Sequence, residues 1–195
     1  MNFHAAGEYI LKRLEKELPS NLYYHGMKHT LEVLRCSEEI AEAEGRNAND
    51  IILIKTAALY HDSGFLVCYR DNERLGCEIA AASLPSFDYT AAEIKNIESM
   101  IMSTALPQTP KDKLSEILCD ADLDYLGTEA FYPISAEFRK ELKEYGTEFT
   151  EKDWLKLELD FMQSHKYFTH TSQQKRNAMK NKHIQELKAS YEKID

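Results

Sequence analysis

The spacing of apolar residues predicts helices along nearly the whole chain, with no internal repeat and almost no strand pattern. In the first expected helix the apolar residues return to one face at helical intervals, and they are Phe3, Ile10, Leu11, Leu14 and Leu18. Pro19 ends this helix, because proline cannot continue the helical hydrogen bonding. A second helix is expected from about Met27 to Glu44, just before Gly45.

Capping residues and helix breakers set the expected ends of the later helices. Asn49 or Asp50 is the expected N-cap of the third helix, and Ser63-Gly64 breaks it. Thr90 stands three residues before a glutamate, which is the spacing of a capping box. The helices predicted after the second cover about 51–62, 73–84, 91–103, 111–126, 135–145, 151–164 and 171 onward.

The length and the absence of a Gly/Ser linker favour a single domain. A chain of 195 residues is typical of one compact unit with its own hydrophobic core. We therefore predict an all-α fold, with residues 1–195 forming a single compact multi-helix domain. The 43% hydrophobic and 10% aromatic content excludes disorder over most of the chain.

Charge narrows the classes of partner. The chain has 33 acidic and 24 basic residues, for a formal net charge of -9, which disfavours binding to a nucleic-acid polymer. The most apolar stretch, residues 51–69, contains Lys55, His61 and Asp62, so no membrane segment is expected. The N-terminus lacks the apolar core of a signal peptide, and the four cysteines show no CxxC or zinc-ribbon spacing, so reduced thiols are expected rather than disulfides. A cytoplasmic location is the resulting expectation.

Two histidines are expected to face the interior. His29 lies in line with Val33 on one face of the second helix, and His61 lies in line with Ile54 and Ala58 on the third. Asp62 follows His61 directly, so both reach one point only near the end of that helix. A buried carboxylate beside a buried imidazole is unfavourable by several kcal/mol unless it is compensated, and a divalent cation is the simplest compensation.

The sixth expected helix offers a third contributor within the sequence CDADLDYLG. Asp120 and Asp122 flank its apolar face on opposite sides, and Asp124 lies nearer Asp120. Periodicity alone leaves open which aspartate turns toward the histidines.

The ordered motifs carry a family resemblance. YHGMKHT at 24–30, then His61-Asp62, then Ala121-Asp122-Leu123 resembles the HD-domain superfamily of metal-dependent phosphohydrolases, in particular its small stand-alone bacterial proteins. The resemblance covers a core of about 20–127 and leaves 128–195 as a helical extension. It implies that one divalent metal ion (Mn, Fe, Co, Ni, Zn or Mg) is bound, with the ligands His29, His61, Asp62 and Asp122.

The same resemblance implies a function. The expected activity is hydrolysis of a small phosphorylated metabolite, most simply a nucleotide mono- or diester, by attack of a metal-activated water. His25 is the candidate general acid, and Asp62 is counted with it as catalytic. The alternative is a regulatory module that binds a metal or nucleotide without turnover.

Several named branches of the superfamily fit less well. The (p)ppGpp hydrolases carry an acidic pair shortly after HD, where this chain has Phe65-Leu66. The HD-GYP enzymes and the cyclic-nucleotide phosphodiesterases have further histidines that this sequence lacks. His165 and His170 are expected at helix ends or on the surface, and Asp120 is expected to support the metal ligands from outside.

Overall fold

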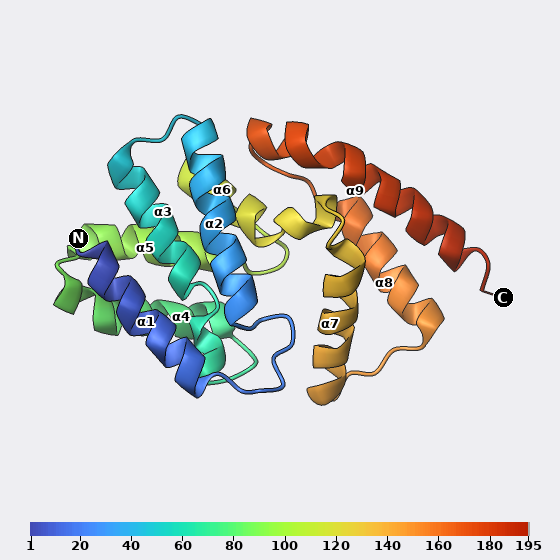
Figure 1. Ribbon diagram of the computed structural model, residues 1–195, viewed down its shortest axis with the longest axis horizontal. Coiled ribbons are helices and arrows are strands. Elements are labelled where there is room, and N and C mark those ends of the chain that lie inside the picture. The colour runs from blue at the N-terminus through green and yellow to red at the C-terminus, as the bar shows by residue number, and fades with distance from the viewer. Residues whose placement is uncertain (195) are drawn as a thin grey trace.

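The computed structural model describes residues 1–194, and within that part of the chain the fold is all-α (Figure 1). No helix in this range has both the length and the apolar character that a membrane crossing requires. The α-helices are α1 (Phe3–Glu17), α2 (Met27–Ala43), α3 (Ala48–Tyr60), α4 (Asn72–Ser83), α5 (Ala91–Ser103), α6 (Lys113–Asp122), α7 (Phe131–Glu144), α8 (Glu151–Ser164) and α9 (His170–Tyr191). Short 3-10 helices lie at η1 (Ser63–Leu66), η2 (Leu84–Phe87) and η3 (Asp124–Gly127).

Helices α1–α6 form an N-terminal lobe around α3. Leu53, Ile54 and Tyr60 of α3 are at most 4% exposed, and α3 packs against α1, α2, α5 and α6. A helix surrounded in this way needs apolar residues on nearly every face, which is why IILIKTAALY reads as almost continuously apolar. The larger hydrophobic core of the protein lies here.

Helices α7–α9 and η3 form a C-terminal lobe, on the right in Figure 1, with a second and smaller hydrophobic cluster. Helix α9 packs along both α8 and η3. The Arg176 guanidinium donates two hydrogen bonds to the Asp124 carboxylate, at 2.7 and 2.8 Å. Gly127 allows this approach, because a Cβ there would lie 2.5 Å from the Cβ of Arg176.

The all-α prediction is confirmed, while two predicted helix starts are wrong. Helix α3 begins at Ala48 rather than after Asn49 or Asp50, because the Asn47 side chain accepts the backbone N–H of Asp50 at 3.0 Å. Helix α7 begins at Phe131 rather than near 135, and Pro133 lies in its first turn, where a helix needs no backbone N–H donor. The single-domain assignment stays a prediction.

The predicted end of the sixth helix is also wrong. Helix α6 stops at Asp122 instead of continuing to 126, and the chain turns through Leu123 into the 3-10 helix η3. The turn places Asp124 beside Arg176 of α9, which a continuous α6 would not do. Asp122 therefore occupies the last turn of α6.

Candidate metal centre

Four side chains from three helices converge between the lobes. His29 lies in the first turn of α2, after Gly26 at the N-cap position. His61 is the C-cap of α3, Asp62 follows it, and Asp122 is the last residue of α6. His29, His61 and Asp62 are all buried. We call His29, His61, Asp62 and Asp122 the His/Asp cluster.

The facing atoms of the cluster lie within a few ångströms of one another. The Nε2 atoms of His29 and His61 are 3.3 Å apart. Asp62 Oδ2 lies 3.4 Å from His29 Nε2 and 3.2 Å from His61 Nε2. Asp122 Oδ1 lies 3.1 Å from His29 Nε2 and 3.7 Å from His61 Nε2. Ligand atoms of His29, His61 and Asp122 all lie within 4.8 Å of one another, close enough to share one ion.

Neighbouring groups turn one atom of each side chain toward the cluster. His61 Nδ1 donates to the Ala58 carbonyl at 2.8 Å, which turns Nε2 toward the cluster. Asn72 donates to Asp62 Oδ1 at 3.1 Å, and Gln108 donates to Asp122 Oδ2 at 3.3 Å. The opposite carboxylate oxygens, Oδ2 of Asp62 and Oδ1 of Asp122, therefore face the two imidazoles.

A close approach of backbone keeps Asn72 in reach of Asp62. A Cβ at Gly64 would lie 1.9 Å from the Asn72 carbonyl oxygen, so only glycine fits at this point of η1. The helix break that Ser63-Gly64 produces therefore has a second consequence. It lets the start of α4 pack against the cluster.

The electrostatics of the cluster favour positive charge. Burial lowers the pKa of His61, but the adjacent Asp62 and then Asp122 outweigh burial and raise it. Burial opposes ionisation of Asp62 as well, yet the charge of the adjacent His61 holds the pKa of Asp62 well below its ordinary value. The two carboxylates thus create a strongly negative potential at the imidazole nitrogens.

The donor set fits a divalent cation. Asp62 Oδ2 is buried and accepts no hydrogen bond from residues 1–194. A buried carboxylate oxygen without a hydrogen bond is unfavourable, and a cation ligand removes that penalty. Two imidazole nitrogens and two carboxylate oxygens suit the first-row divalent metals and Mg²⁺.

Another buried carboxylate holds His25 beside the cluster. Glu141 of α7 is 0% exposed and accepts the backbone N–H groups of Tyr24 and His25 at 2.9 and 3.0 Å. It also pairs with His25 Nδ1 and accepts the Tyr69 hydroxyl at 3.2 Å. Although burial alone would lower the pKa of His25, the hydrogen bond with Glu141 raises it. Helix α7 thereby fixes the loop that precedes α2.

Glu141, Asn72 and Gln108 were missed by the sequence analysis. Glu141 had a detectable signal, because it lies three residues after Phe138 and seven after Ile134, on the inner face of α7. A lone acid at an inward position is a candidate for a buried pair. The two amides had no such signal, because their partners lie 10 and 14 residues away along the chain.

The other aspartates of the CDADLDYLG segment have structural partners. Asp120 accepts the backbone N–H groups of Phe168 and Thr169 and the Thr169 hydroxyl, so it anchors the turn before α9. These hydrogen bonds go to the turn before α9, so they do not provide the support of the metal ligands that the sequence analysis expected from Asp120. Asp124 pairs with Arg176. The structure thus brings Asp122 alone of the three to the histidines.

The two late histidines are not members of the His/Asp cluster. His165 is the C-cap of α8, and its carbonyl accepts a hydrogen bond from Lys180. Burial lowers the pKa of His165 to about 3. His170 is the exposed first residue of α9. Both positions agree with the expected placement at helix ends.

A cavity of about 510 Å³ opens from the cluster into the space between the lobes. His25, Asp62 and Asp122 line it beside the cluster, and Trp154 and Glu158 of α8 line it from the C-terminal lobe. We call this space the interlobe cavity. A smaller cavity of about 320 Å³ reaches His29 and Asp122 from another side and contains Lys28 among its lining residues. The cluster is therefore accessible to a small molecule.

Comparisons with known proteins agree with this architecture. The HD domain family matches residues 26–124, just over half of the chain. YpgQ of Bacillus subtilis, solved in complex with ADP, has 19% identity and a TM-score of 0.69, with 100% of both chains covered. A predicted HD superfamily hydrolase from an uncultured Thermotogales bacterium has 20% identity and a TM-score of 0.63, covering 94% of this chain and 92% of its own.

Lin1889 of Listeria innocua is similar in fold as well, with 18% identity, a TM-score of 0.67 and 100% of both chains covered. The comparison with curated proteins gives no match. The family match includes all four residues of the His/Asp cluster. The chain is a member of the HD domain family.

Proposed function

We propose that this protein is a metal-dependent phosphohydrolase that acts on a small phosphorylated metabolite, most simply a nucleotide mono- or diester. The observation that carries the proposal is the His/Asp cluster, where two imidazole nitrogens and two carboxylate oxygens face one point. His29, His61, Asp62 and Asp122 are the proposed ligands of one divalent metal ion. Such an ion supplies a water of lowered pKa and polarises a phosphoryl oxygen.

The family and its structural neighbours support this proposal. A neighbour of the same fold is described as a predicted hydrolase, and YpgQ was solved with ADP, a small phosphorylated molecule. The acidic chain favours such a ligand over a nucleic-acid polymer. A substrate phosphate would lie beside Asp62 and Asp122, where they line the interlobe cavity.

His25 is the proposed general acid. Its Nδ1 is held by Glu141, so Nε2 is the ring nitrogen left for a substrate. His25 lines the interlobe cavity with Asp62 and Asp122, within the space that a bound phosphate ester would occupy. From that place it can donate a proton to the oxygen of the leaving group.

Metal analysis tests the ligand set. Purified protein reconstituted with Mn²⁺ should bind about one ion per chain, and Asp122→Ala should lose it. Asp120→Asn is the matched control on the same helix, because Asp120 contacts the turn before α9 instead of the cluster. Full metal occupancy in Asp122→Ala would contradict the assignment.

Turnover tests the reaction. Phosphomonoesters and phosphodiesters should be hydrolysed with added Mn²⁺, Co²⁺ or Ni²⁺, and His61→Ala should abolish this activity. His25→Ala should slow esters of poor leaving groups more than 4-nitrophenyl phosphate, whose leaving group needs little protonation. Nucleotide binding without hydrolysis in the presence of any of these metals would contradict the hydrolase proposal and favour the regulatory module.

A further inference from the structure

A series of aromatic rings lines the interlobe cavity. Tyr24 packs on His29 of the cluster with ring centroids 4.6 Å apart, and Phe138 packs on Tyr24 at 5.4 Å. Trp154 follows, with its centroid 6.1 Å from that of Phe138. Its indole N–H donates to Ser135 Oγ at 3.2 Å, which fixes the ring. A flat, uncharged group would find stacking surfaces along this path.

The polar groups of the cavity set the charge of its occupant. No lysine or arginine stands among the described residues that line it, whereas Asp62, Glu73, Asp122 and Glu158 all do. A phosphate in the aromatic part would face these carboxylates, because the Arg139 guanidinium, 5.7 Å from the Trp154 ring centroid, does not line the cavity and is paired with Glu151. The part of a substrate that fills this volume is therefore uncharged or cationic. Its phosphate belongs at the cluster.

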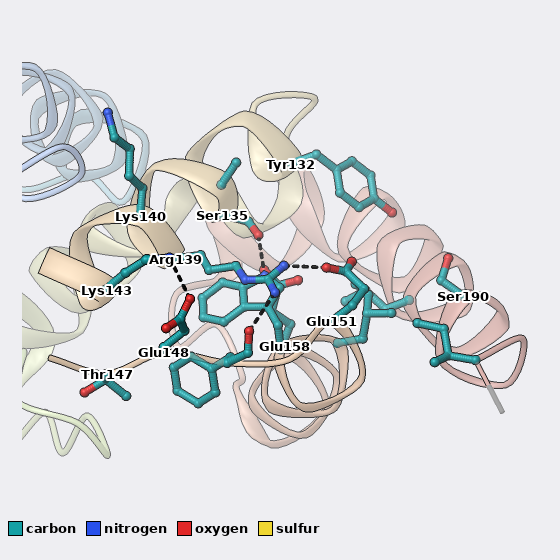
Figure 2. A pocket seen from close by; sticks show the side chains of 16 residues that line it. Tyr132, Ser135, Arg139, Lys140, Lys143, Thr147, Glu148, Glu151, Glu158 and Ser190 are labelled. Atoms are coloured by element: carbon teal, nitrogen blue, oxygen red, sulfur yellow. Dashed lines mark hydrogen bonds and ion pairs between the residues drawn. The ribbon is translucent and has the colours of Figure 1, made fainter.

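Glu158 places a hydrogen-bond acceptor in the cavity lining, one helical turn after Trp154 on α8. The nearby Arg139 guanidinium is paired with Glu151. Burial raises the pKa of Glu158, and the neighbouring Ser135 hydroxyl acts against that rise. Glu158, Ser135 and Trp154 also line an outer groove of about 700 Å³ among α7, α8 and α9, where Figure 2 labels Ser135 and Glu158.

We propose that the interlobe cavity binds the uncharged planar ring of an amino-bearing nucleobase, and that Glu158 accepts a hydrogen bond from the exocyclic amino group. The inference rests on the proposed function, because it assigns the organic part of the phosphate ester that the cluster would cleave. A volume of about 510 Å³ suits a ring system with its sugar better than a compact cationic head group. Glu158 is then a specificity-determining residue.

Turnover with matched esters tests the proposal. With Mn²⁺ present, adenosine 5′-monophosphate should exceed purine riboside 5′-monophosphate, which lacks only the amino group, by roughly 10-fold or more in kcat/KM. Ribose 5-phosphate should have a lower kcat/KM than either nucleotide. Glu158→Leu should make the two nucleotides equivalent. Glu148→Leu is the control, since Glu148 lines the outer groove but not the interlobe cavity.

A binding measurement separates this proposal from the hydrolase assignment. Trp154 is the only tryptophan in the chain and lines the cavity, so its fluorescence reports occupancy without metal or turnover. Adenosine should quench it, purine riboside should do so more weakly, and the difference should vanish in Glu158→Leu. Adenosine binding without hydrolysis of any ester would support the cavity assignment while the proposed function fails.

Three results would overturn the cavity assignment. The first is hydrolysis of 4-nitrophenyl phosphate with equal kcat/KM for the two nucleotides and ribose 5-phosphate. The second is no effect of adenosine on Trp154 emission. The third is a preference for phosphocholine over adenosine 5′-monophosphate, which would show that the aromatic rings and carboxylates hold a cation instead of a base.

Discussion

Removal of the Glu141 carboxylate is the sharpest test of how the two lobes cooperate. Glu141 stands on α7 and its acceptor oxygens bind the loop before α2, so one side chain joins the C-terminal lobe to the residues beside the cluster. Its carboxylate accepts hydrogen bonds from four donors, which are the backbone N–H groups of Tyr24 and His25 and the side chains of His25 and Tyr69. It is completely buried.

The expected loss follows from those partners. Glu141→Ala leaves a partly buried imidazole and two backbone N–H groups without their acceptor, and breaking a buried pair in this way costs about 3–5 kcal/mol. For a chain of this size that loss lowers the melting temperature by roughly 6–20 °C. Glu141→Gln keeps one carbonyl oxygen for the backbone donors, so we expect a smaller loss of about 1–3 kcal/mol.

The stability that the Glu141–His25 pair provides depends on pH. Burial alone would raise the pKa of Glu141, but the hydrogen bonds and charge of His25 lower it below its ordinary 4.5. The stabilisation by the ionised Glu141 is therefore present above pH 4.5 and disappears as pH falls. Glu141 raises the pKa of His25 above 6.5, so the contribution of His25 is complete below 6.5 and disappears as pH rises. The difference between wild type and Glu141→Gln should therefore be largest between pH 4.5 and 6.5.

Urea unfolding followed by circular dichroism at a series of pH values measures these differences. Glu144→Gln is the matched control, because Glu144 is exposed on the same helix and should leave the unfolding free energy unchanged. A Glu141→Ala variant within about 1 kcal/mol of wild type would refute the reasoning. So would a difference for Glu141→Gln that stays constant across pH.

Two further predictions concern packing around the cluster. Gly64→Ala should unfold at a lower urea concentration and bind Mn²⁺ more weakly. The added Cβ displaces the Asn72 backbone and so weakens the hydrogen bond from Asn72 to Asp62. An unchanged Mn²⁺ affinity in a titration would contradict this prediction. Arg176→Ala should lower the unfolding free energy by about 3–5 kcal/mol, because it leaves the nearly buried Asp124 carboxylate unpaired. Lys156→Ala, which breaks an exposed pair, is the control, and an equal loss in both variants would count against the buried pair.

The sequence by itself determined the helical class and most of the metal-site candidates. Helical class follows from apolar spacing and capping, which act over a few residues, and the Thr90–Glu93 capping box is present as expected. Inward placement of His29 and His61 follows from the same spacing, because a polar residue in line with buried neighbours shares their environment. These are local properties of the chain.

The tertiary structure alone decided which groups meet. Asp120 and Asp122 were equivalent by periodicity, and the end of α6 at residue 122 placed one at the histidines and the other at the turn before α9. Glu141 reaches His25 across 116 positions of sequence, and α8 brings Glu158 to the cavity that begins at the cluster. Contacts at such separations depend on how helices pack, and the pattern within one helix carries no record of its neighbours.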